Sequence, residues 1–128
     1  MNTEFEPVIG LEIHVQLGSK TKLFCSCPNG VGDDTKPNTA ICPVCAGHPG
    51  VLPVLTEGAL ELAVRAGLSM NCKTNETSSF SRKHYFYPDL PKGYQITQNE
   101  EPINGAGYIE ITFGPKENLQ KKRIGIHH

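Results

Sequence analysis

Two close pairs of cysteines constrain this chain more than any other feature of its sequence. Cys25 and Cys27 are one residue apart, Cys42 and Cys45 are two residues apart, and fourteen residues separate the pairs. A tight turn at each pair directs two thiolates toward one point, and two such turns complete the tetrahedron that zinc takes with sulfur. The residues between the pairs are mostly loop formers. The pattern therefore predicts a structural zinc site that staples a loop over residues 23–50.

Other interpretations of the four cysteines are weaker. Disulfides are disfavoured because Met1–Glu6 is polar and lacks the apolar core of a secretory signal, and a cytosolic chain keeps its thiols reduced. Redox chemistry is disfavoured because Gly47, Pro49 and Gly50 follow the second pair where an activating helix would begin. A metal site degraded to free thiols stays open. Cys72 stands apart and is expected to be a small buried apolar residue.

Composition narrows the class of protein. The 128 residues suffice for one domain, or for one domain and part of another, and 13 Gly and 10 Pro indicate abundant loops. A net charge of -1 gives no basic field that would bind nucleic acid by bulk electrostatics. No apolar run is long enough to span a membrane, so we expect a cytoplasmic chain, or one of an organelle matrix in a eukaryote, without a membrane partner. Lys121–His128 stops within a strand pattern, so we expect residues 1–128 to be the N-terminal part of a larger domain, truncated at the C-terminus.

The segment Leu11–Leu17 alternates strictly between apolar and polar residues, which predicts a half-buried strand. Its polar face carries Glu12, His14 and Gln16. Side chains on one face of a strand lie roughly 7 Å apart, so Glu12 and His14 can reach a shared ion or substrate. A solvated face on an ordinary strand stays open as the alternative.

One helix and several strands are predicted after the cysteines. The helix has an apolar stripe, begins at an N-cap Thr56 and stops near Asn71. The turn Pro88–Gly93 separates two strands, because proline fixes φ and Gly93 allows a positive φ. The expected elements are a helix over 56–70 and strands over 77–87, 94–98, 108–113 and 122–126. Short turns between successive strands predict an α+β fold with one main helix and a largely antiparallel sheet.

Residues 82–92 are dense in groups that bind phosphate or stack on a nucleotide base. Arg82, Lys83 and Lys92 are cationic donors, and Tyr85 is one of three aromatic residues between them. No glycine-rich phosphate loop occurs in the sequence, so ATP would bind on a sheet through side chains and metal. An aromatic strand with a solvated basic edge stays open as the alternative.

Three stretches together resemble one family of proteins. They are Val8–Leu17, the cysteine quartet followed by Gly47–Pro53, and Arg82–Ile96. The chain resembles the N-terminal part of the B subunits of aspartyl/glutamyl-tRNA(Asn/Gln) amidotransferases over nearly all of its length. The resemblance implies a catalytic cradle domain with a fold similar to glutamine synthetase.

The resemblance also implies a reaction and partners. In such proteins ATP activates the side-chain carboxylate of Glu-tRNA(Gln) or Asp-tRNA(Asn) as an acyl phosphate. Ammonia from glutamine then displaces phosphate and gives the amide. The implied partners are a glutaminase subunit, a small third subunit and the mischarged tRNA.

The site residues follow from the resemblance and the chemistry together. Glu12 and His14 are expected to be catalytic and to ligate Mg²⁺, with a contact through water as the alternative for His14 because hard cations prefer oxygen. Arg82, Lys83, Tyr85 and Lys92 are expected to contact ATP or the acyl phosphate. Further metal-binding carboxylates and the tRNA-binding domains are expected beyond His128, so the chain alone is expected to be inactive.

Two rival functions use fewer of these features. A non-catalytic zinc module that binds RNA or protein fits the cysteines equally well, but has no need of the stretch Arg82–Ile96. A stand-alone metal enzyme centred on Glu12 and His14 lacks the further ligands such a site requires.

Overall fold

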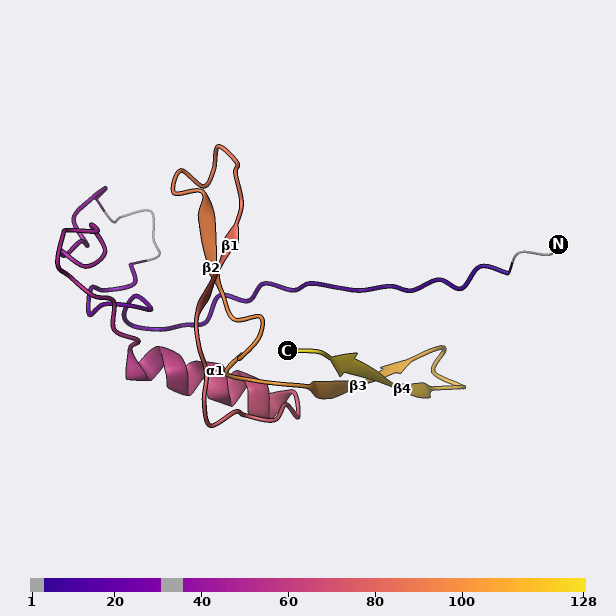
Figure 1. Cartoon of the computed structure of the whole chain (residues 1–128). Coiled ribbons are helices and arrows are strands. Elements are labelled where there is room, and N and C mark those ends of the chain that lie inside the picture. The colour runs from indigo at the N-terminus through magenta and orange to yellow at the C-terminus, as the bar shows by residue number, and fades with distance from the viewer. Residues whose placement is uncertain (1–3, 31–35) are drawn as a thin grey trace.

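The structure is a computed structural model that describes residues 4–30 and 36–128. Its elements, in chain order, are α1 (Glu57–Ser69), β1 (Ser81–His84), β2 (Tyr94–Thr97), β3 (Gly107–Phe113) and β4 (Gln120–Ile126). The α+β class and the antiparallel pairing are confirmed (Figure 1). The strands nevertheless form two separate two-stranded sheets, β1–β2 and β3–β4, where one sheet was predicted. Each sheet is a hairpin of neighbours in sequence, and the described residues supply no strand that joins them.

Helix α1 matches its predicted range but begins differently. The carbonyl of Thr56 accepts the first helical bonds, from the N–H groups of Ala59 (3.1 Å) and Leu60 (3.2 Å). The hydroxyl of Thr56 does not cap the helix and instead donates to the carbonyl of Lys22 (3.2 Å). The start of the helix is therefore tied to the cysteine loop rather than closed by its own side chain.

The end of α1 follows the sequence signal. Asn71 takes a positive φ of 53°, which asparagine tolerates better than most residues. The Cys72 N–H then donates to Gly67 O (2.9 Å) and the Asn71 N–H to Leu68 O (3.2 Å). This pair of bonds is the Schellman arrangement, which satisfies carbonyls that the helix end would leave without donors. The predicted stop at Asn71 is confirmed.

The chain after α1 runs antiparallel to residues 103–108. The bonds that join them run from Tyr108 N–H to Met70 O (3.0 Å), from Lys73 N–H to Ala106 O (3.1 Å) and from Asn75 N–H to Ile103 O (2.9 Å). Cys72 is buried here, only 7% exposed, as the sequence predicted. It packs so closely on β3 that a Cβ added to Gly107 would lie 2.4 Å from its Sγ. This contact seats the β3–β4 hairpin on the end of the helix.

Residues 73–106 form an arm that ends in the β1–β2 hairpin. The Ser79 N–H donates to Glu101 O (3.1 Å) below the hairpin, and the Tyr85 N–H donates to Gly93 O (3.0 Å) above it. Gly93 has a φ of +71°, as expected for the turn that proline and glycine predicted. The β1–β2 hairpin at its end stands away from α1 and the β3–β4 hairpin (Figure 1). The lower part of the arm contacts the helix, because the Asn104 side chain donates to Ala63 O (2.7 Å).

The predicted strand Leu11–Leu17 is wrong for this structure. The segment forms no strand with any described residue, and its apolar side chains are exposed: Leu11 83%, Ile13 78% and Val15 72%. A strand needs a neighbour for its backbone groups and its apolar face. Here the segment projects from the rest of the chain (Figure 1). Its alternation is that of a strand whose partner the described residues do not supply.

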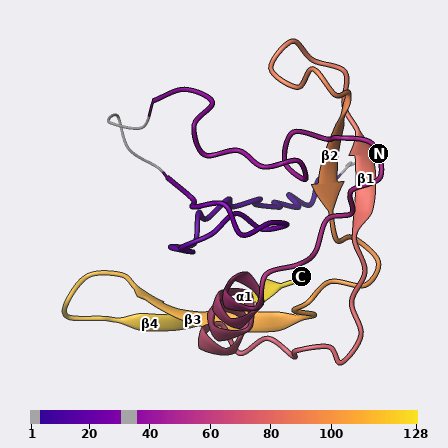
Figure 2. The ribbon, with the colours of Figure 1, turned by 90° about the vertical axis from the view of Figure 1, so that its left-hand side faces the viewer.

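The fold is open. The accessible surface is 11192 Å², against about 6,700 Å² for an average folded monomer of this mass. Cys25 and Cys72 are the buried hydrophobic side chains among the described residues. The cysteine loop and both hairpins extend from the region of α1 (Figure 2). No helix in the described ranges is both long and apolar enough to cross a membrane.

Candidate functional site

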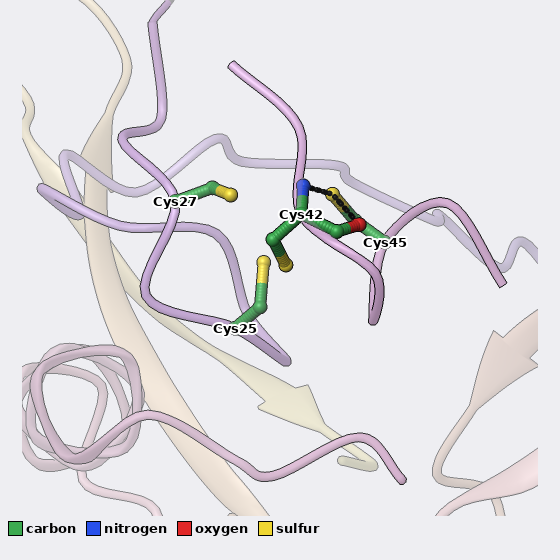
Figure 3. Close-up of side chains that lie close together, drawn as sticks. All are labelled: Cys25, Cys27, Cys42 and Cys45. Atoms are coloured by element: carbon green, nitrogen blue, oxygen red, sulfur yellow. Dashed lines mark hydrogen bonds between the residues drawn. The ribbon is translucent and has the colours of Figure 1, made fainter. Parts of the chain in front are cut away.

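The four predicted ligands converge. The Sγ atoms of Cys25, Cys27, Cys42 and Cys45 all lie within 4.8 Å of one another. Figure 3 shows two of them on one loop and two on a second loop that faces it. A zinc–sulfur bond of about 2.3 Å gives a tetrahedron edge of about 3.8 Å, so a small inward movement would complete the shell. All five cysteines of the chain are free, and the quartet fits a metal ion better than a disulfide.

The first cysteine pair lies on a short hairpin loop. The Lys22 N–H donates to Cys27 O (2.9 Å), and the Asn29 N–H donates to Lys20 O (2.9 Å). These bonds close the chain on itself around Cys25, whose side chain is buried. The turn needs only residues within a ten-residue stretch, which is why local spacing predicted it.

The second pair lies on a tight turn. The Ala46 N–H donates to Cys42 O (2.9 Å), and the Cys42 N–H donates to Cys45 Sγ (3.1 Å, dashed in Figure 3). Backbone donors aimed at sulfur stabilise thiolate over thiol and so prepare the site for a cation. His48 continues the turn by donating its own N–H to Pro43 O (3.0 Å).

The thiols of the cluster differ in acidity. Hydrogen bonding from the backbone of Cys45, opposed by burial, lowers the pKa of Cys42 to about 7. Burial, followed by hydrogen bonding with Cys42 and Cys25, raises the pKa of Cys27 to about 12. The two pKa shifts have opposite signs because the sulfurs are crowded: one thiolate is stabilised by hydrogen bonds from neighbouring thiols that stay protonated. A bound cation would reverse the balance and favour four thiolates.

The cysteine loop is fastened to the start of α1. The Val54 N–H donates to Phe24 O (3.2 Å) and the Thr56 N–H donates to Leu23 O (3.0 Å). The rings of Phe24 and Phe80 meet edge to face, with centroids 5.1 Å apart. The loop is thus coupled both to the helix and to the part of the arm directly before β1.

Glu12 and His14 lie together but stand in solvent. The His14 Nε2 is 3.6 Å from the Glu12 Oε1, and their side chains are 79% and 80% exposed. The alternation in the sequence therefore brought an acid and an imidazole to one side of the chain. No third carboxylate, cysteine or imidazole completes a ligand group around them in the described residues.

The hairpin divides the four candidate nucleotide contacts. Arg82 pairs with Ile96 and His84 with Tyr94, so these four residues share one face, while Lys83 pairs with Gln95 on the other face. Aromatic stacking confirms the alternation further along: Tyr85 stacks on Tyr87 with centroids 5.0 Å apart. Lys83 and Tyr85 therefore lie on the face opposite Arg82.

Tyr94 is the residue that sequence reasoning missed. The Arg82 guanidinium lies 4.5 Å from its ring centroid and the Lys92 ammonium 5.1 Å. These are cation–π distances. The hairpin register gives the signal: Tyr94 faces His84 and is therefore diagonal to Arg82 across the pair. Arg82, Lys92 and Tyr94 form a basic and aromatic group at the free end of the arm.

Comparison with known proteins gives the same family as the sequence motifs did. The family described as GatB/GatE catalytic domain matches residues 7–128. The B subunit of an aspartyl/glutamyl-tRNA(Asn/Gln) amidotransferase from Lawsonia intracellularis is 58% identical over 98% of this chain and 25% of its own length. The B subunits of the same name from Persephonella marina and Elusimicrobium minutum are 56% and 54% identical over 97% and 98% of this chain, and 25% and 28% of their own lengths. The chain spans about a quarter of the length of these curated relatives.

Proposed function

The chain belongs to the family of GatB/GatE catalytic domains, and from this premise we propose that it is the N-terminal part of a subunit that amidates mischarged tRNA. The single observation that carries the proposal is the family match over residues 7–128. Three relatives more than half identical, which bear the same name, agree with it. The substrates are Glu-tRNA(Gln) or Asp-tRNA(Asn), and the partners are a glutaminase subunit and a small third subunit in the cytoplasm. The rival zinc-module function has no comparable support.

The reaction has two steps. The side-chain carboxylate of the aminoacyl group attacks the γ-phosphorus of ATP, which forms an acyl phosphate and releases ADP. Ammonia derived from glutamine then attacks the acyl carbon, and phosphate leaves with the electron pair of the broken bond. The first step needs positive charge on the phosphate oxygens and a fixed carboxylate, both of which side chains on an exposed sheet can supply.

Glu12 and His14 are proposed to hold the divalent cation. Mg²⁺, when bound, would neutralise phosphate charge during transfer. The Glu12 carboxylate is the oxygen ligand that Mg²⁺ prefers, and His14 beside it would hold a metal-bound water. Two residues do not fill an octahedral shell, so this pair fits as one side of a site. The remaining oxygens would come from phosphate, water or residues outside the described ranges.

Two sets of side chains are proposed to contact ATP or the acyl phosphate. Arg82 and Lys92 lie on the face of the hairpin that carries Tyr94, where cations and a ring suit phosphate and base together. Lys83 and Tyr85 lie on the opposite face. One nucleotide cannot contact both faces in the same way, so we propose that the Tyr94 face holds the nucleotide and that the other face approaches the acyl group or the tRNA.

The cysteine quartet is proposed to hold zinc as a brace. Four sulfur ligands leave no open coordination position for catalysis. The loop they would close is hydrogen-bonded to the start of α1, and its Phe24 contacts Phe80, which directly precedes β1. Zinc would therefore affect the activating site indirectly, by fixing the conformation of the cysteine loop and of the elements that contact it.

The open architecture supports a larger functional unit, resembling a cradle like that of glutamine synthetase. Leu11, Ile13 and Val15 expose a strand-like apolar row that soluble proteins normally cover. An apolar hollow of about 440 Å³ also lies open between the cysteine loop, α1 and Phe80. We propose that further parts of a full-length subunit cover these surfaces and that the 128-residue chain alone does not catalyse the reaction.

The test uses the full-length subunit co-expressed with its glutaminase partner. Glu12→Ala should abolish ATP-dependent conversion of Glu-tRNA to Gln-tRNA while glutamine hydrolysis continues, because only the metal-bound phosphoryl transfer is lost. Glu6→Ala is the matched control, an exposed acid on the same segment, and should leave conversion unchanged. Persistent amidation by Glu12→Ala would refute the metal assignment. ADP release by the 128-residue chain that depended on Glu-tRNA would refute its inactivity.

A further inference from the structure

Lys22 brings a positive charge to the edge of the cysteine quartet. Its Nζ lies 3.6 Å from Cys45 Sγ and donates to the carbonyl of Ala40 at 2.7 Å. Ala40 lies two residues before Cys42, so both contacts are with the second cysteine turn. The side chain is half-buried, which distinguishes it from a lysine free in solvent.

The backbone of the same residue is fixed by two other parts of the chain. The Lys22 N–H donates to Cys27 O (2.9 Å) on the first cysteine loop. The Lys22 carbonyl accepts from the Thr56 hydroxyl (3.2 Å) at the start of α1. One residue therefore contacts both cysteine loops and the helix, and its ammonium is held at the quartet by a backbone that has little freedom to move.

The negative charge of the thiolates explains why the Lys22 ammonium matters at this position. Four thiolates around one divalent cation leave a net charge of about -2 on the cluster. An N–H donor to a ligand sulfur withdraws electron density and lowers the repulsion among thiolates. Cys45 is the exposed member of the quartet, so its sulfur is also the one most open to attack by electrophiles.

We propose that Lys22 is a positioning residue of the metal centre: its ammonium compensates the charge of the four-thiolate cluster at Cys45 and shields that sulfur. The inference rests on the proposed zinc site and names a residue outside the ligand set. It does not depend on amidotransferase activity. Lys22 would in addition couple occupancy of the site to α1, because its carbonyl holds Thr56.

The test measures zinc in the full 128-residue chain. Lys22→Met keeps the unbranched apolar stem of the side chain and removes its charge and donor. Lys20→Met is the matched control, because Lys20 is exposed and, within the described residues, it bonds Asn29 through its carbonyl. Zinc affinity is measured by competition with a chromogenic chelator, and alkylation of the zinc-loaded protein at Cys45 by mass spectrometry. We expect Lys22→Met to weaken zinc binding about tenfold and to accelerate alkylation of Cys45.

The remaining outcomes separate the proposals. Lys22→Arg retains charge and donors, and it should restore most of the affinity. Equal zinc affinity and alkylation in Lys22→Met and Lys20→Met would overturn the role of Lys22 while leaving the zinc site intact. A wild-type chain that binds no zinc would overturn both. Should Lys22→Met fail to fold by circular dichroism, Lys22→Leu serves as the neutral variant without a donor, with the same expected results.

Discussion

The cysteine loop and the N-terminal segment 7–17 carry equally clear sequence patterns, yet they differ completely in the structure. The loop forms its predicted cluster, with every Sγ within 4.8 Å of the others. The segment forms no strand with the described residues and exposes Ile13 to 78%. The difference is in where the partners of each feature lie.

A cysteine cluster of this kind is complete within a short stretch. Its sulfurs come from two turns, and each turn is closed by backbone bonds between near neighbours, such as Lys22 with Cys27 and Cys42 with Ala46. A strand has no such independence, because its hydrogen bonds and apolar face belong to a neighbouring strand. A sequence pattern therefore forms its expected structure in a short chain only when the residues that must contact it lie nearby in the sequence.

Loss of one cysteine ligand should have the largest effect of these changes. It tests whether the cysteine loop is held together by a metal, which is the half of the comparison that concerns the loop. Cys42→Ser should lose most of its zinc and melt at least about 5 °C lower, because a structural metal contributes folding energy directly. Metal analysis and thermal melts check this, and activity in the full complex should fall only as a consequence. Cys72→Ala is the control: it leaves a cavity beside Gly107 and lowers stability, but retains zinc. Lost activity in Cys42→Ser with unchanged zinc and melting temperature would contradict the role of a brace.

Acidity within the loop gives a second test, in the chain freed of metal. The pKa of Cys42 is lowered to about 7 and that of Cys27 is raised to about 12. As pH rises, Cys42 therefore becomes thiolate first, and at neutral pH iodoacetamide should label it more than about tenfold faster than Cys27. Mass spectrometry after timed alkylation checks the order. Equal rates would mean that the turns do not hold this geometry without metal.

Close packing between Cys72 and Gly107, at the C-terminal end of α1, should leave no room for one additional methyl group. In Gly107→Ala the new Cβ would lie 2.4 Å from Cys72 Sγ and 2.7 Å from its Cα. Such overpacking should destabilise the chain by about 1–3 kcal/mol, measured by urea unfolding. Gly125→Ala, in the same hairpin with nothing within 4 Å, is the control and should change little.

The smallest effect is expected in the N-terminal segment. Ile13→Ser removes an apolar side chain that is already 78% exposed, so it should change the free energy of unfolding of this chain by less than about 0.5 kcal/mol. Urea unfolding of the 128-residue chain measures it. A loss of several kcal/mol would show that the segment packs in solution and would remove the contrast with the loop. In the full-length subunit, where we propose that this row is covered, the same change should cost much more.

Much of the secondary structure could be predicted from the sequence. The helix, its stop at Asn71 and the turn at Gly93 depend on residues within a few positions of one another, and the structure confirms all three. The convergence of the cysteines was predictable for the same reason. The hydrogen-bond partner of the Thr56 hydroxyl could not be predicted, because this hydroxyl donates to the carbonyl of Lys22, 34 residues earlier in the chain.

Sheet organisation and the cross-strand neighbours within the hairpin could not be predicted from sequence patterns. Alternation assigns Arg82 and Lys83 to opposite faces but does not say which face a partner strand completes. The contribution of Tyr94 required the register that sets it opposite His84. Whether Glu12 and His14 form a metal site depends on further ligands, which none of the residues that the structure describes provides, so the metal site there remains a prediction.

The arm of residues 73–106 has a consequence for how fast the chain folds. Its two sides are joined in order, from Tyr85 with Gly93 near the tip, through Ser79 with Glu101, to Lys73 with Ala106 at the base. Each pair encloses the one before it, so each closure starts from chain ends that the previous pair already holds close together, and the entropy of closure is lost in steps. We expect the arm to zip from the tip downward within about 1–10 μs, the time of an isolated hairpin. Arg82, Lys92 and Tyr94 would then be assembled before the helix end and β3 meet.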